Sequence, residues 1–257
     1  MLVTIDVGNT QTVIGLFSGA ELVSHWRIAT NAERTSDEYA LLLRQFLESD
    51  DVALAGLTGV AVSSVVPRIT AALREMGDRY LECPTLVIEP GIKTGMPILY
   101  DNPKEVGADR IANAVAAFEK FGGPTIVVDF GTATTVDAVS AKGEYLGGAI
   151  VPGIEISLDA LFGRAAALRR VELVPPKHVI GKSTVESIQA GAVYGFSGQV
   201  DAIVDRFTAE LGEATVVATG GLSGLLLPFS RTLEHHEPWL TLEGLRIVFA
   251  RNADDFA

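Results

Sequence analysis

Two stretches of the sequence, about half a chain apart, carry the same short pattern. Residues 3–13 read Val-Thr-Ile-Asp-Val-Gly-Asn-Thr-Gln-Thr-Val, and residues 126–136 read Ile-Val-Val-Asp-Phe-Gly-Thr-Ala-Thr-Thr-Val. The aspartate, the glycine two positions later, the threonine six later and the valine seven later coincide. A repeated pattern indicates a repeated structural unit. The chain is therefore predicted to contain two similar lobes.

Each copy of the repeat begins a series of three short apolar segments. Turn-forming pairs such as Gly8-Asn9 and Ser18-Gly19 separate the segments. The segments are 2–5, 12–17 and 21–28 in the first series, and 125–128, 135–139 and 145–151 in the second. This arrangement is typical of a β-meander, so each lobe is predicted to open with one.

The rest of the chain predicts helices and further strands, and hence an α/β fold. Thr35 and Glu38 form a predicted capping box before the first helix. Apolar periodicity predicts helices around 39–47, 68–81, 111–118 and Thr184–Leu211, and strands at 60–66, 85–88, Thr215–Thr219 and 245–249. The N-terminal lobe is expected to span 1–117 and the C-terminal lobe 118–257.

Composition excludes several classes of function. The formal net charge is −12 and no Lys/Arg-rich block occurs, which argues against a nucleic-acid or anionic-membrane surface. A compact site for an anionic ligand stays open, because it needs only local donors and a metal ion. The single cysteine, Cys83, excludes an intrachain disulfide and fits a reducing compartment. With no signal-peptide pattern and no apolar run of membrane-spanning length, the protein is expected to be soluble and cytoplasmic.

The turn that begins at Asp6 has the composition of a phosphate-binding loop. Gly8 lets the backbone approach a ligand, and the N–H groups and side chains of Asn9 and Thr10 can donate to phosphate oxygens. Asp6 cannot attract phosphate directly, so its place at the strand end makes sense if a divalent cation or its waters lie between them. The alternative is an ordinary turn with an Asx-type hydrogen bond.

The second copy offers a matching loop, and two such loops facing each other across a cleft would clamp a polyphosphate and its metal. A glycine pair after the strand Thr215–Thr219 would let a flat adenosine ring lie against the backbone, although alone it reads as a strand-exit turn. The expected ATP contacts are Asp6, Gly8, Asn9, Thr10, Gly131, Thr132, Thr134, Gly220 and Gly221, with Asp129 placed as Asp6 is.

The motif Gly107-Ala108-Asp109-Arg110 places a carboxylate and a guanidinium together at the start of a predicted helix. Asp109 would act as general base on a substrate hydroxyl, while Arg110 holds a polar substrate or developing phosphate charge. The alternative is that Asp109 caps the helix.

Two other motifs are weaker. Gly181-Lys182-Ser183-Thr184 resembles the end of a P-loop, but Pro176 stands where that loop needs glycine. Ser183 is instead predicted to cap the following helix, although a hydroxyl there can also hold substrate. The adjacent histidines His235 and His236 have no ligand cluster nearby and are expected to lie in a solvated loop.

Several motifs in fixed order resemble those of type III pantothenate kinases, in the acetate and sugar kinase/actin superfamily. They are Asp6-Val-Gly-Asn-Thr10, Ser63-Ser-Val-Val-Pro67, Tyr100-Asp-Asn-Pro103, Gly107-Ala-Asp-Arg110, Asp129-Phe-Gly-Thr132, Gly147-Gly-Ala-Ile-Val-Pro-Gly153 and Gly181-Lys-Ser-Thr184. The resemblance extends to Gly221 and implies two actin-like (ribonuclease H-like) lobes with a nucleotide cleft between them.

The resemblance also implies an activity: phosphorylation of pantothenate by ATP with magnesium or another divalent cation, the first step toward coenzyme A. It implies a homodimer, a monovalent cation such as potassium or ammonium at Asp129, and a water-mediated divalent cation at Asp6. The substrate residues it implies are Tyr100, Gly107, Ala108, Asp109, Arg110 and Thr184. Two alternatives remain: another small-molecule kinase of this fold, or a regulatory or chaperone-like ATPase.

Overall fold

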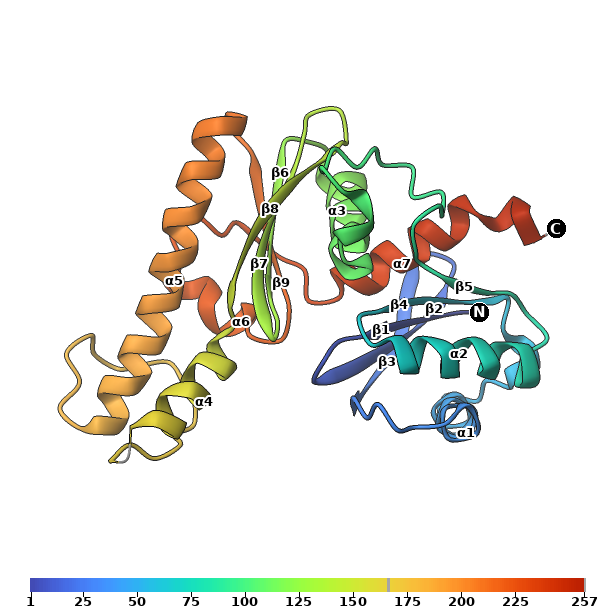
Figure 1. Ribbon diagram of the computed structural model, residues 1–257, viewed down its shortest axis with the longest axis horizontal. Helices are drawn as coiled ribbons and strands as arrows, with labels where there is room; N and C mark the ends of the chain where they lie inside the picture. Colours follow the sequence, from blue (N-terminus) through green and yellow to red (C-terminus); the bar gives the residue numbers. More distant parts are fainter. Residues whose placement is uncertain (166, 257) are drawn as a thin grey trace. The chain divides into compact units, whose positions relative to one another are not determined.

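The computed structural model describes residues 1–165 and 167–256, which form two compact units (Figure 1). Unit 1 comprises Met1–Ala116 together with the segment that begins at Leu240, and unit 2 comprises Ala117–Trp239. Each unit has its own five-stranded mixed sheet.

The sheet of unit 1 follows the predicted meander and adds two parallel strands. Its strands are β1 (Leu2–Val7), β2 (Gln11–Ser18), β3 (Glu21–Ala29), β4 (Gly59–Ser64) and β5 (Thr85–Val87), in the order β3-β2-β1-β4-β5. β1 pairs antiparallel with β2 and parallel with β4. Because both faces of β1 and β4 are covered, these strands are apolar almost throughout.

Helices cover the sheet of unit 1. They are α1 (Ser36–Glu48), α2 (Pro67–Tyr80) and α7 (Leu240–Arg251), and the first part of α3 (Ala108–Phe121) also belongs to this unit. The predicted capping box at Thr35 is present, with Thr35 Oγ1 and the Glu38 carboxylate each accepting from the other residue's backbone N–H. Leu43 and Leu73 pack against Val3 on the sheet in one apolar core. α7 packs against β1 and β4, and the backbone of α7 at Gly244 lies against that of Ala112 in α3.

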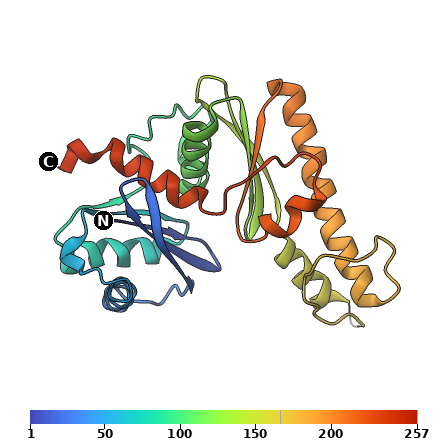
Figure 2. The same ribbon diagram turned by 180° about the vertical axis from the view of Figure 1, so that it is seen from behind.

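Unit 2 repeats the same topology. Its strands are β6 (Thr125–Phe130), β7 (Ala133–Val139), β8 (Tyr145–Pro152), β9 (Thr215–Thr219) and β10 (His235–His236), and its helices are the end of α3, α4 (Ile154–Arg164), α5 (Thr184–Leu211) and α6 (Ser223–Leu226). The strand order β8-β7-β6-β9-β10 matches that of unit 1 strand for strand. Both views show α5 running alongside this sheet (Figures 1 and 2), and it contacts β6 and β7. The two-lobed α/β prediction is thus confirmed.

Three details differ from the predictions. Residues 245–249 were expected to form a strand but lie in α7, where Leu242, Leu245 and Val248 are buried at a helical spacing of three. Short apolar runs fit either structure, and packing decides between them. The segment from Leu240 onward belongs to unit 1, although the expected division at 117 gave it to the second lobe. The two histidines form β10, which pairs with β9, rather than a loop.

Candidate active site

The first predicted phosphate loop is a tight turn between β1 and β2. The Gly8 N–H donates to Gln11 O at 3.0 Å, which closes the turn, and Asn9 and Thr10 are exposed at its tip. Thr30, after β3, supports the turn: its hydroxyl donates to Gly8 O at 2.8 Å and its N–H donates to Thr10 O at 3.0 Å. Sequence reasoning missed Thr30, because no motif links it to the loop.

Asp6 lies at the end of β1, one residue before the turn region, and is half-buried. Its Oδ1 accepts a hydrogen bond from the hydroxyl of Ser63, the paired residue on the parallel strand β4. Ser63 belongs to a motif that carries the family resemblance, yet sequence reasoning gave it no role. The sequence feature that could have revealed Ser63 is a hydroxyl residue near the end of a mostly apolar strand.

The second loop is the corresponding turn between β6 and β7. Asp129 occupies the same place in β6 that Asp6 has in β1. The Gly131 N–H donates to Ala133 O at 3.1 Å, and Thr132 O accepts from Gly153 N–H at 3.1 Å. A Cβ on Gly153 would collide with the carbonyls of Gly131 and Thr132, so this glycine lets the end of β8 support the loop. Thr134 lies within β7 and is 1% exposed, away from the tip of the turn.

The glycine pair after β9 lies beside Asp129. Gly220 has φ +89, a conformation that favours glycine, and a Cβ there would collide with Asp129 Oδ1 and lie 2.6 Å from Phe130 N. Ser223 fixes the turn by donating its hydroxyl to Gly220 O at 2.6 Å, and His236 contacts the same hydroxyl at 2.9 Å. The structure therefore brings two of the predicted nucleotide segments, at Asp129 and at Gly220, together in unit 2.

The motif at residues 107–110 begins α3. Asp109 is the second helical residue rather than the N-cap, and its Oδ1 accepts from the Arg110 N–H at 2.8 Å. Arg110 is 8% exposed, an unusual degree of burial for a guanidinium. A carboxylate and a buried cation are thus held together at the positive end of a helix dipole.

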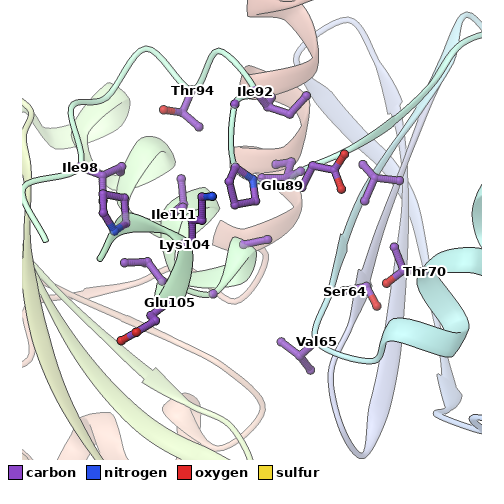
Figure 3. Close-up of a pocket in the computed structure, with 18 of the residues that line it drawn as sticks. Ser64, Val65, Thr70, Glu89, Ile92, Thr94, Ile98, Lys104, Glu105 and Ile111 are labelled. Carbon is purple, nitrogen blue, oxygen red and sulfur yellow. The ribbon is translucent and has the colours of Figure 1, made fainter. Parts of the chain in front are cut away.

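A cavity of about 770 Å³ within unit 1 reaches this helix start. Figure 3 shows that its lining comes from three places: the exit of β4 with the start of α2, the loop around residues 89–98, and the segment that leads into α3. Gly107 and Ala108 are part of the lining, while Val65, Ile98 and Ile111 make it largely apolar. Such a cavity suits a small molecule with an apolar body and a few polar groups.

Asp109 and Arg110 are not among the lining residues, and the other expected substrate residues, Tyr100 and Thr184, also lie outside the lining. Tyr100 is 36% exposed on the loop before α3. Thr184 is the first residue of α5 in unit 2, exposed, and follows Ser183, whose Oγ accepts from Glu186 N–H at 3.2 Å. The predicted helix cap at Ser183 is confirmed.

The donor set suits a cation that keeps its own waters. In residues 1–165 and 167–256 no group of three or more His, Cys, Asp and Glu side chains is arranged to hold a metal ion. A single carboxylate such as that of Asp6 or Asp129 is compatible with Mg²⁺, which binds through one or two carboxylates, waters and substrate phosphates. Within the same residues, no helix is long and apolar enough to cross a membrane.

The two units have the actin-like fold that several solved structures share. The structure is similar over 98% of the chain to component A of (R)-2-hydroxyglutaryl-CoA dehydratase from Acidaminococcus fermentans, with a TM-score of 0.60, 16% identity and 98% of that chain covered. It is also similar to an inorganic polyphosphate/ATP-glucomannokinase from an Arthrobacter strain, with a TM-score of 0.51, 17% identity and 98% of both chains covered. At these identities the likeness establishes the fold alone.

Sequence comparison gives the family. The type III pantothenate kinase profile matches residues 2–206. A type III pantothenate kinase from Streptomyces avermitilis is 58% identical to this chain, and the match covers 98% of each protein. A type III pantothenate kinase from Moorella thermoacetica is also 58% identical, and that match covers 98% of this chain and 100% of the relative. The chain belongs to the type III pantothenate kinase family.

Proposed function

We propose that the protein transfers the terminal phosphoryl group of ATP to the primary hydroxyl of pantothenate, giving 4′-phosphopantothenate, in the first step of coenzyme A biosynthesis. The observation that carries the proposal is the matched pair of Asp-Gly turns, one in each unit. Because ATP and pantothenate are both used inside the cell, we place the enzyme in the cytoplasm.

Each of the two turns contributes to binding the phosphates of the nucleotide. The exposed side chains of Asn9, Thr10 and Thr132 supply donors for phosphate oxygens, while Gly8 and Gly131 close the turns and let the backbone come near the phosphates. Thr134 contributes through its place in β7 behind the second turn. The remaining nucleotide contacts are Gly220 and Gly221, whose turn leaves a flat surface for the adenosine.

Asp6 and Asp129 hold the cations. Asp6 faces a divalent cation through its waters, and Asp129 binds a monovalent cation, potassium or ammonium. When bound, the divalent cation neutralises charge on the β- and γ-phosphates. Support for Asp129 comes from Gly220, because a Cβ at that position would collide with the Asp129 carboxylate.

Pantothenate enters the cavity in unit 1 with its hydroxyl directed to Asp109. Asp109 accepts the hydroxyl proton as the oxygen attacks the γ-phosphorus, and the bond from that phosphorus to the ADP oxygen breaks. Arg110 balances the developing charge, and the backbone of Gly107 and Ala108 positions the acceptor at the helix start. Tyr100 and Thr184 are further proposed substrate contacts.

A coupled assay of ADP release tests the proposal. Pantothenate, glycerol, acetate and no acceptor are compared at equal ATP, magnesium and potassium concentrations. ADP release is expected with pantothenate alone. Release with glycerol or acetate would indicate another kinase of this fold, and equal release without any acceptor would indicate a regulatory or chaperone-like ATPase; either result contradicts the proposal.

The enzyme is a homodimer in this proposal, and unit 2 offers the surface. Gly191, Gly195 and Gly198 line one exposed face of α5, and a Cβ on any of them would meet no atom within 4 Å. Close packing inside the subunit therefore does not explain them. Exposed apolar side chains also gather in this unit, at Ile150 (62%) and Ile180 (82%) among others, as expected for a surface that another subunit covers.

A further inference from the structure

The hydroxyl of Ser63 is buried and directed at a carboxylate of the proposed nucleotide site. Ser63 ends the apolar run of β4 and is 1% exposed. Its Oγ donates to Asp6 Oδ1, on the parallel neighbour β1, where the two residues are paired in register. In paired positions of parallel strands the side chains point to the same face, so the contact is built into the sheet.

The second unit has the same arrangement. Asp129 on β6 is paired in register with Thr219 on the parallel strand β9. Thr219 is also 1% exposed, and it too lies at the end of its strand before a turn. Both repeats therefore place a buried hydroxyl residue beside the aspartate, at the corresponding parallel strand. Packing in the sheet does not require a hydroxyl at this position, because an apolar side chain like those of Val60 and Val62 in β4 would fill the space equally well.

We infer that Ser63 is a positioning residue for Asp6. The hydrogen bond occupies one lone pair of Oδ1 and restricts rotation of the carboxylate group. Oδ2 is then held in one orientation toward the proposed water shell of the divalent cation. Charge-assisted hydrogen bonds to carboxylates are strong and directional enough for this task. The inference rests on the proposed function, since it gives Asp6 its orientation there.

Two substitutions remove the donor in different ways. Ser63→Ala deletes the hydroxyl, and Ser63→Cys fills the space with a weak donor. Ser63→Thr keeps the hydroxyl, and Thr219 shows that the equivalent position of the other sheet accepts threonine. Ser197→Ala is a matched control, because Ser197 is equally buried at 1% and its Oγ has no hydrogen-bond partner among the residues described.

The readouts are turnover as a function of Mg²⁺ and calorimetric binding of a non-hydrolysable ATP analogue with and without Mg²⁺. Ser63→Ala and Ser63→Cys are expected to lower kcat roughly 10- to 100-fold, the loss that matches one charge-assisted hydrogen bond. Both should also weaken binding of the analogue with Mg²⁺ and leave metal-free binding unchanged. Ser63→Thr and Ser197→Ala should behave as the wild type. If Ser63→Ala fails to fold, Ser63→Cys decides the question.

Asp6→Asn, alone and combined with Ser63→Ala, separates this inference from the proposed function. If Ser63 acts through Asp6, the double variant is no worse than Asp6→Asn. Normal Mg²⁺-dependent binding and turnover in both donor-removing variants, while Asp6→Asn is inactive, would overturn the inference and leave the proposed function standing. Near-normal turnover of Asp6→Asn would overturn the assignment of Asp6 itself.

Discussion

At the level of single residues, Asp109 is the group on which the proposed chemistry depends. It lies in the first turn of α3, where its Oδ1 accepts from the Arg110 N–H at 2.8 Å. A role in stabilising the helix start and a role as general base are both compatible with this position, and the Asp109→Asn variant separates them. The sequence motif predicted the juxtaposition with Arg110, but the burial of Arg110 follows from packing that no local pattern encodes.

Asp109→Asn should lower kcat by about 10²–10⁴-fold, the range that a positioned general base contributes. Asparagine has nearly the same shape and can still accept from the Arg110 N–H, so the melting temperature should change little. ATP affinity should be unchanged, because the proposed nucleotide contacts are the turns after Asp6 and Asp129 and the glycine pair at Gly220, not Asp109. Steady-state kinetics, calorimetry with an ATP analogue and thermal unfolding check these three outcomes. An unchanged kcat would mean that the base is another residue.

Asp129→Asn should remove most turnover at saturating magnesium and potassium. The amide is neutral, so a monovalent cation loses the charge that holds it, while Gly220 still has room beside the side chain. The potassium concentration that gives half-maximal rate should rise at least tenfold. Measuring rate against potassium, with sodium keeping the ionic strength constant, gives the result. A potassium dependence equal to that of the wild type would contradict the assignment of Asp129.

At the level of elements, the long helix α5 is tied to the loop after α6 through one carboxylate. Asp201 in α5 is 8% exposed and accepts from Ser230 Oγ at 2.6 Å and Thr232 Oγ1 at 2.8 Å, and from the N–H groups of Arg231 and Thr232. Burial alone would raise its pKa, but these hydrogen bonds outweigh burial and hold the pKa below the ordinary 3.8. Asp201 is therefore a pH-dependent link in unit 2.

The sign of that dependence follows from the lowered pKa. Stability from Asp201 is fully present above the unfolded pKa near 3.8 and is lost as the pH falls through the lower folded value. Asp201→Ala should cost about 2–3 kcal/mol near pH 7, and the difference from the wild type should shrink below about pH 4. Asp205→Ala, which removes an exposed ion pair with Arg231, should cost under about 1 kcal/mol. Thermal unfolding of both variants from pH 3 to 7 tests this; a pH-independent difference for Asp201→Ala would contradict it.

Most elements could be predicted from the sequence because their signals are local. The bounds of α5 and β9 agree with the predictions because a capping serine precedes the helix and turn residues follow the strand. Helix α7 could not be predicted, since Leu245–Val248 fits a strand until one knows that Ala112 of α3 packs against Gly244. Thr30 and Ser63 were missed for the same reason: their partners are far away in the chain, at Gly8 and Asp6.

At the level of the whole molecule, the repeat predicted the main architectural fact, two sheets with the same strand order. Light scattering tests the proposed dimer: the chain of 27.2 kDa should give one species of twice that mass at micromolar concentration. A single species near 27 kDa would refute it.

Gly195→Leu should weaken that dimer without unfolding the subunit. A Cβ at Gly195 has open space within the chain, so the leucine would be accommodated in the monomer and would obstruct only a closely packed partner. The mass should shift toward the monomer as the protein is diluted. Gly56→Leu is the matched control, because Gly56 is exposed in unit 1 and a Cβ there would meet only Val52 within 4 Å. Equal masses for both variants would place the interface elsewhere.

The return of the chain to unit 1 at Leu240 has a consequence for biosynthesis. Unit 2 is contiguous, from Ala117 to Trp239, whereas unit 1 needs α7 against β1 and β4. On the ribosome, the first 116 residues emerge early but lack the helix that covers one face of their sheet. All of unit 2 is synthesised before that helix. The lobe whose synthesis begins first therefore cannot complete its fold until Leu240–Arg251 has been made.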